Sequence, residues 1–140
     1  GLEEKTDFKV ADATESWPYE SSMFDFGIDC FASTDIETFE DRQFAAKEFS
    51  RVLKPEGYLF VYALSTDDEF HKMMAIESPT NESGAFVNPA GKFEKSFTEQ
   101  EIIELHGGLK LIKKERIEKN ATFYGKEYKC FHHMMIFRKT

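Results

Sequence analysis

The sequence predicts an α/β fold with a mainly parallel sheet and an antiparallel hairpin at the C-terminus. Two runs, MFDFGIDCFAS and YLFVYALS, carry apolar residues on both alternating faces, as strands buried on both faces do. A helical pattern separates them, and two β-like runs around a turn end the chain. Alternating strands and helices imply parallel neighbours with right-handed crossovers, whereas a terminal hairpin adds an antiparallel strand.

Composition and charge narrow the class of protein. The chain has 140 residues, 41% of them hydrophobic, which suits one packed domain over residues 1–140. A net charge of −8 argues against nucleic acid as a partner, because phosphate binding needs a cationic face. No apolar run approaches the ~18 residues of a membrane span. The acidic start GLEEKTDF does not resemble a secretion signal, so we expect a cytoplasmic protein with no membrane partner.

The N-terminal third is expected to supply two strands. DFKVADA is a short β-like run that ends at Asp12, and ESWPYESS after it has the Pro and Ser content of a loop. The next strand is expected within residues 23–33. Cys30 lies in it and Cys130 lies in a later apolar run, and we expect both thiols to be reduced and buried.

A helix is expected from Asp35 to Leu53, because Ala45, Phe49 and Val52 recur on one helical face. Pro55 ends this helix, since proline lacks the N–H for the next hydrogen bond. The KPEG segment then predicts a type I turn, in which Glu56 needs no positive φ. YLFVYALS follows directly as a buried strand.

The second half of the chain is patterned unevenly. We expect a short helix near residues 69–75 and then a long loop, which contains SPTNESG and NPAG. Thr98 and Glu101 form a capping-box pattern that opens a helix, and Gly107-Gly108 should end it in left-handed geometry. LKLIKKERIEK and KEYKCFHHMMIFRK, separated by NATFYG, predict the terminal hairpin.

This order of motifs resembles the C-terminal two-thirds of a class I S-adenosylmethionine-dependent methyltransferase. The matching pieces are VADATESWPYESSMFDFGIDCFAS, RVLKPEGYLFVYALS, FTEQEI and the hairpin that ends in HHMMIFRK. Together they cover nearly the whole chain. The resemblance implies a partial Rossmann-like sheet, S-adenosylmethionine as the cofactor and a small-molecule methyl acceptor. The family's usual Leu-Lys-Pro-Gly-Gly has Glu56 at its first glycine here.

The resemblance also implies positions for the ligands. Asp12 would accept a hydrogen bond from the adenine amino group, and the backbone of Ala13 would meet the ring. Asp29 and Cys30 would lie near the methionine part of the cofactor. Phe31 would lie near the acceptor, and His71, in the region that follows YALS, is a further candidate for contact with the acceptor.

One feature of the family is absent from the sequence. Its first strand ends in a loop of G-x-G type, and none of the eight glycines of this chain forms that pattern. Aligned in this way, the chain lacks the family's first two strands and most of the cofactor pocket, so we expect weak cofactor binding or none. The family's first strand neighbours the one that corresponds to FGIDCFA. We therefore expect an exposed edge there, either covered by DFKVADA or paired with a second copy in a homodimer.

Two alternatives accompany this hypothesis, a non-catalytic module and a metal site. The chain could be a non-catalytic module that acts by pairing with another protein. If it is an enzyme, a base is needed only where the acceptor must lose a proton, and His71 and Tyr62 are candidates. A metal site from Cys130, His132, His133 and His106 is disfavoured, because His133 faces away from Cys130 and His132 on a strand.

Overall fold

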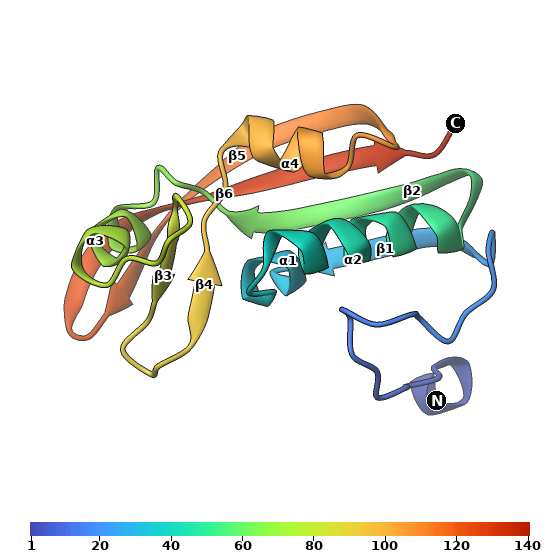
Figure 1. Cartoon of the computed structure of the whole chain (residues 1–140), viewed down its shortest axis with the longest axis horizontal. Helices are drawn as coiled ribbons and strands as arrows, with labels where there is room; N and C mark the ends of the chain where they lie inside the picture. The colour runs from blue at the N-terminus through green and yellow to red at the C-terminus, as the bar shows by residue number, and fades with distance from the viewer.

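A computed structural model describes all 140 residues except the side chain of Leu2. After a 3-10 helix, η1, the chain forms four α-helices and six β-strands (Figure 1). In chain order these are η1 (Leu2–Lys5), β1 (Phe24–Cys30), α1 (Ala32–Asp35), α2 (Phe39–Val52), β2 (Leu53–Leu64), α3 (Glu69–Glu77), β3 (Ala85–Val87), β4 (Phe93–Lys95), α4 (Glu99–Leu105), β5 (Lys110–Phe123) and β6 (Lys126–Arg138).

The main sheet has the strand order β1-β2-β6-β5. β1 and β2 are parallel, whereas β6 is antiparallel to both β2 and β5. The α/β class and the terminal hairpin are therefore confirmed, and the sheet of this chain is mixed. A small antiparallel sheet of β3 and β4 stands with α3 beside the carboxyl ends of β1 and β2 (Figure 1).

Helices α2 and α4 cover one face of the sheet, and the core lies beneath them (Figure 1). Side chains from β2, β6 and α4 fill this core, among them Leu59, Val61, Phe137 and Ile102. Apolar side chains also occupy the opposite face, but no helix covers them. Phe26 is 53% exposed and Ile28 is 60% exposed. β1 is thus an edge strand with one apolar face open to solvent.

The expected N-terminal strand does not form. Residues 7–13 pair with no other strand that the structure describes, and Phe8 and Val10 are almost fully exposed. A strand needs a neighbour for its backbone hydrogen bonds, and this segment has none. The expectation that DFKVADA covers the edge of β1 is therefore wrong. Cys30 is also exposed, contrary to expectation, whereas Cys130 is buried.

The helix expected over residues 35–53 forms as α2 but begins later, at Phe39, because Ile36 is extended and Thr38 is the N-cap; Asp35 instead ends the short helix α1. The type I turn is wrong as well: Glu56 has a φ of 68° within β2. Helix α4 ends at Leu105, its C-cap His106 has a φ of −100°, and neither Gly107 nor Gly108 has positive φ. The hairpin turn is at Tyr124-Gly125, since β5 continues through NATF.

The short helix expected near residues 69–75 is confirmed as α3, and the capping box of α4 is present. The long loop, in contrast, contains β3 and β4. Strands of three residues leave too short a pattern to detect by alternation. None of the helices in the described part of the chain is long and apolar enough to cross a membrane.

Candidate functional site

A cavity of about 350 Å³ lies where β1 and β2 reach their carboxyl ends. Its apolar lining includes Phe31, directly after β1, Leu64, at the end of β2, and Phe123 of β5. His71 of α3 and His132 of β6 also line it. Ligands of open α/β sheets bind at this end of the strands, so the cavity is the candidate functional site.

Phe31 owes its position to backbone geometry. It has a φ of 62°, in the left-handed region, and its N–H donates to the Tyr62 carbonyl at 2.9 Å. Its ring makes edge contacts with Tyr62 and His132, whose centroids lie 5.2 and 5.3 Å away. A non-glycine residue in this region is uncommon and often marks a functional position.

Charged and hydroxyl groups complete the wall near α1. Asp35 pairs with Lys92 at 2.6 Å, and both side chains line the cavity. Thr34 also lines it, and its hydroxyl is buried without a hydrogen-bond partner among the described residues. A buried hydroxyl without a partner is costly, so a polar ligand atom or water is favoured beside it.

The side chains of Asp68 and His71 lie close together at the start of α3. Nδ1 of His71 lies 2.8 Å from Oδ1 of Asp68, although the ring N–H does not point straight at this oxygen. The Asp68 carboxyl is fully buried. Burial opposes its ionisation, but the nearby ring of His71 and the hydrogen bond from its backbone N–H outweigh this and lower the pKa of Asp68 to about 2.

On β6, His132 and Cys130 are buried neutral groups. Nδ1 of His132 lies 2.9 Å from the Tyr62 hydroxyl. Burial, assisted by the charge of Lys119, lowers the pKa of His132 to about 4. Burial also raises the pKa of the Cys130 thiol to about 11, with a further contribution from Asp68. This thiol is therefore protonated at neutral pH.

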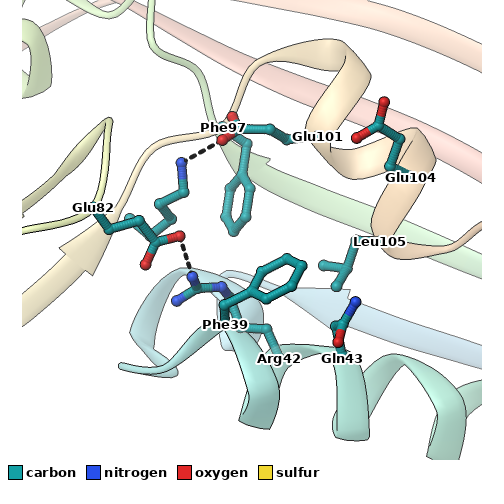
Figure 2. A pocket seen from close by; sticks show the side chains of 9 residues that line it. Phe39, Arg42, Gln43, Glu82, Phe97, Glu101, Glu104 and Leu105 are labelled. Carbon is teal, nitrogen blue, oxygen red and sulfur yellow. Dashed lines mark hydrogen bonds and ion pairs between the residues drawn. The ribbon is translucent and has the colours of Figure 1, made fainter.

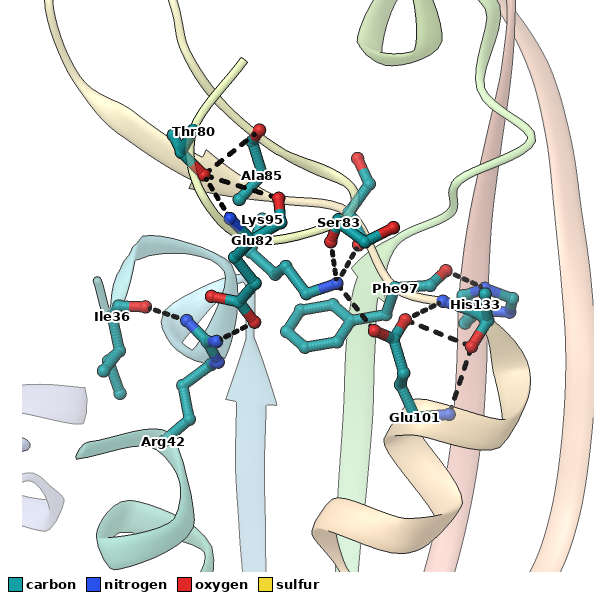
Figure 3. Close-up of polar contacts among 12 residues, drawn as sticks. Ile36, Arg42, Thr80, Glu82, Ser83, Ala85, Lys95, Phe97, Glu101 and His133 are labelled. Atoms are coloured by element: carbon teal, nitrogen blue, oxygen red, sulfur yellow. Dashed lines mark hydrogen bonds and ion pairs between the residues drawn. The ribbon is translucent and has the colours of Figure 1, made fainter. Parts of the chain in front are cut away.

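The β3–β4 hairpin, residues 85–95, forms one wall of the cavity through Lys92 and Glu94. Two buried cations attach this region to the helices (Figure 3). Arg42 of α2 pairs with Glu82 and donates to the Ile36 carbonyl at 2.6 Å. Lys95 pairs with Glu101 of α4 at 2.8 Å and donates to the Ser83 carbonyl at 2.7 Å.

The same two ion pairs border a second cavity, of about 210 Å³, between α2 and α4 (Figure 2). Phe39, Phe97 and Leu105 supply its apolar lining. Since Arg42 and Lys95 are already paired with carboxylates, this cavity presents no free buried charge. Lys95 is at the end of β4, so this short strand separates the two cavities.

The four residues predicted to bind the cofactor do not gather. Asp29 is buried on the helix side of β1, where Ser33 donates its N–H at 3.2 Å and its hydroxyl to the carboxylate. Burial raises the pKa of Asp29, although these hydrogen bonds oppose the shift. Cys30 lies on the opposite, open face. Asp29 and Cys30 thus lie on opposite faces of β1, and the role of these four residues in cofactor binding stays a prediction.

Asp12 and Ala13, the other two residues predicted to bind the cofactor, make hydrogen bonds to nearby residues. The exposed Asp12 carboxylate accepts the Thr14 N–H at 2.8 Å, which lowers the pKa of Asp12. The Ala13 carbonyl accepts from the Trp17 ring at 3.1 Å. Trp17 in turn packs edge-on against Phe49 of α2, with ring centroids 4.7 Å apart. These contacts anchor the segment beside α2.

The two residues predicted to contact the acceptor are brought together. Phe31 and His71 are 40 residues apart in sequence, yet both line the cavity at the strand ends. Sequence reasoning missed Asp68, Thr34 and Phe123. Asp68 had a detectable signal, because an Asp three residues before His71 matches a helix N-cap. Phe123 had none, since its approach depends on how far the hairpin extends.

His132 and His133, two of the residues considered for a metal site, lie on opposite faces of the sheet. Nε2 of His133 lies 2.9 Å from the Phe97 carbonyl, on the helix-covered face, whereas His132 lines the cavity on the other face. Among the side chains that the structure describes, no three His, Cys, Asp or Glu are grouped to hold a metal ion.

Comparison with known proteins assigns the fold. A family model described as "Methyltransferase domain" matches residues 2–61. A SAM-dependent methyltransferase from Methanosarcina mazei superposes with a TM-score of 0.81 at 25% identity, covering 95% of this chain and 66% of that one. The chain therefore has the class I S-adenosylmethionine-dependent methyltransferase fold. The comparison with curated proteins finds no significant match.

Two further structures show the range of this fold. The 1,6-didemethyltoxoflavin-N1-methyltransferase of Burkholderia thailandensis, solved with S-adenosylhomocysteine, has a TM-score of 0.62 at 15% identity, covering 93% of this chain and 49% of that one. The [4+2]-cyclase SpnF has a TM-score of 0.63 at 18% identity, covering 99% and 57%. The chain thus spans about half to two-thirds of the length of these structures.

Proposed function

We propose that the protein containing this chain transfers a methyl group from S-adenosylmethionine to a small-molecule acceptor. The observation that carries the proposal is the cavity of about 350 Å³ at the carboxyl ends of β1 and β2 in a methyltransferase fold. Its size and its mixed apolar and polar lining suit a small organic molecule. In this proposal the chain provides the acceptor side of the active site.

The cofactor side is proposed to depend on residues other than those described. Asp29 is buried and already bonded to Ser33, so it is not free to hold a ligand. The apolar face around Phe26 and Ile28 is uncovered, next to the strand end where the cofactor would lie. This arrangement supports weak or absent cofactor binding by the 140 residues alone.

The test is methyl transfer by the complete protein. S-adenosylmethionine labelled in its methyl group is incubated with a mixture of small phenols, amines and nitrogen heterocycles, and the organic products are counted. Label in a small-molecule product supports the proposal. Binding of S-adenosylhomocysteine by the complete protein without any labelled product would contradict it, and would favour a non-catalytic or cyclase-like role.

A second candidate function is pairing through β1, and the open edge and face of this strand favour it. Phe26, Ile28 and Tyr58 expose large apolar surfaces next to unpaired backbone groups of an edge strand. We infer that a second copy of the chain pairs with this edge. In this hypothesis the chain acts as a homodimeric module.

Light scattering coupled to size-exclusion chromatography tests the pairing. The chain is expected to elute as a dimer, and Ile28→Lys as a monomer, because a charge would be buried at the interface. Ile76→Lys is the matched control, since Ile76 is 77% exposed on α3, away from β1. A monomeric wild-type chain would exclude the dimer.

A further inference from the structure

The Asp68 carboxylate accepts more hydrogen bonds than an N-cap residue alone would. Oδ1 of Asp68 accepts the His71 backbone N–H at 2.9 Å, as an N-cap does. Oδ2 accepts the Phe131 N–H of β6 at 3.1 Å, and the Asp68 N–H donates to the Ser65 carbonyl at 3.1 Å. The carboxylate is therefore fixed between α3, β6 and the end of β2.

Three aromatic rings pack against the imidazole of His71. Its ring stacks on that of Phe86, with centroids 5.5 Å apart and an interplanar angle of 24°. It also contacts Phe70 and Phe123 edge-on. Nδ1 lies at Asp68, so Nε2 is the ring nitrogen left for the cavity that His71 lines. An aspartate beside Nδ1 favours the tautomer that carries its proton there, with a lone pair on Nε2.

We propose that His71 is the general base for the acceptor and that Asp68 is its positioning residue; this inference rests on the proposed function. The acceptor is then a molecule whose nucleophilic atom carries a proton, such as a phenol, an enol or a ring N–H. That proton passes to the lone pair on Nε2. The acceptor becomes an anion, and His71 becomes an imidazolium that the Asp68 carboxylate stabilises.

The rest of the cavity agrees with a flat acceptor of this class. Phe31, Phe123 and Leu64 offer apolar surface for a ring. The unpartnered Thr34 hydroxyl is available for a polar substituent. Tyr62, the other candidate base, is less suitable: its hydroxyl contacts His132, and burial raises the pKa of this hydroxyl, which keeps it protonated at neutral pH.

Charged and titratable groups from several elements line the cavity together with His71. The closest are Asp68 on its own helix and the neutral His132 and Cys130 of β6. The cavity wall adds Asp35, Lys92, Glu94 and Lys119. At neutral pH the wall carries two positive and two negative charges, so Asp68 is the carboxylate that decides the local balance.

The first test needs no methyl donor. 4-Nitrophenol is titrated into the chain at a fixed, mildly acidic pH, and its visible absorbance reports ionisation of the bound phenol. Wild-type chain is expected to bind it with a larger ionised fraction than His71→Gln does. Lys72→Gln, an exposed neighbour on α3, is the matched control and should behave as wild type. Equal ionisation in wild type and His71→Gln would overturn the proposal.

The second test uses the complete protein with any acceptor found above. His71→Gln is expected to lower kcat/KM by about 10²–10⁴-fold and to remove the acidic limb of the pH–rate profile. Asp68→Asn should lower the rate at least tenfold while circular dichroism remains that of wild type. Transfer that persists in His71→Gln overturns the base assignment alone. Absence of saturable phenol binding by wild type overturns the acceptor cavity and, with it, the proposed function.

Discussion

Glu56 adopts a backbone conformation that is unfavourable for a residue with a side chain. Its φ of 68° lies in the left-handed region, which costs a non-glycine residue about 1–2 kcal/mol. The position is retained by an ion pair with Arg138 and a backbone hydrogen bond to the Lys139 carbonyl at 2.8 Å. A glycine would avoid this strain, which gives a physical reason for the glycine usual at this position in the methyltransferase family that the sequence resembles.

Replacement of Glu56 isolates the backbone strain. Glu56→Gly and Glu56→Ala both remove the exposed ion pair with Arg138, and they differ only in their tolerance of positive φ. We expect Glu56→Gly to be about 1 kcal/mol more stable than Glu56→Ala. Urea denaturation followed by circular dichroism measures the difference. Equal stability of the two variants would show that the turn relaxes to negative φ.

His106 is a buried imidazole at the end of α4, packed against Phe137 at a centroid distance of 5.2 Å. Neither ring nitrogen has a partner among the described residues. Burial therefore lowers its pKa from 6.5 to about 4. Because the unfolded chain takes up this proton first, the stabilising effect of the neutral ring is present above pH 6.5 and decreases as the pH falls toward 4.

The pH dependence of stability provides the corresponding prediction. At pH 5 the shift of His106 should cost about 2 kcal/mol relative to pH 7. His106→Phe keeps an aromatic ring on Phe137 but cannot titrate. We expect its loss of stability between pH 7 and pH 5 to be smaller than that of wild type by this amount, in urea denaturation at both pH values. His132 titrates in both proteins and serves as the internal control.

At the scale of elements, local signals and tertiary contacts contribute differently. The capping box of α4 is entirely local: Thr98 Oγ1 accepts the Glu101 N–H at 3.2 Å, and Glu101 accepts the Thr98 N–H at 2.7 Å. It was therefore predictable from four adjacent residues. β1 was also predictable from its composition. Its position at the edge of the sheet, with one face open, depends on which strands and helices pack beside it.

The cap of α4 can be tested directly. Thr98→Ala removes the side-chain acceptor for the Glu101 N–H and is expected to destabilise the chain by about 1 kcal/mol. Thr98→Ser keeps the hydroxyl and should be nearly neutral. Thermal denaturation of the two variants in parallel checks the difference. Equal melting temperatures would mean that Lys95, which also pairs with Glu101, is sufficient to hold the start of the helix.

At the scale of the molecule, the segment between α3 and α4 is joined to the helices by ion pairs of different burial. Arg42 is 1% exposed where it meets Glu82, whereas Lys92 and Asp35 are about half exposed where they meet. A buried cation that loses its partner is costly, but an exposed pair contributes little. The Arg42–Glu82 pair should therefore dominate the attachment of this wall of the acceptor cavity.

Removal of each pair tests that ranking. Glu82→Ala leaves Arg42 buried with only backbone carbonyls and is expected to cost about 2 kcal/mol, discounted from the value for a fully buried pair because Glu82 is partly exposed. Lys92→Ala should cost less than about 1 kcal/mol. Hydrogen exchange of the β3 and β4 amides should accelerate in Glu82→Ala only. Similar exchange in both variants would assign the attachment to Lys95 and Glu101 instead.

Residue patterns alone were enough to predict the strands around residues 24–30 and 58–64, the stripe of α2, the cap of α4 and the terminal hairpin. Each depends on spacing or on neighbours within about four residues, and such preferences act before the chain is packed. The motifs that carry the family resemblance also indicated the methyltransferase fold, whereas contact of Phe31 and His71 with an acceptor stays a prediction.

The folded chain decided the rest, since it depends on contacts between distant segments. DFKVADA has a strand-like composition but pairs with no described strand, and Asp29 is buried where it accepts the Ser33 N–H of α1. Asp68 meets His71 at the edge of a cavity only because α3 packs against β6, at the Phe131 N–H. Burial and pairing at these sites are collective properties of the packed molecule, so no local pattern could reveal them.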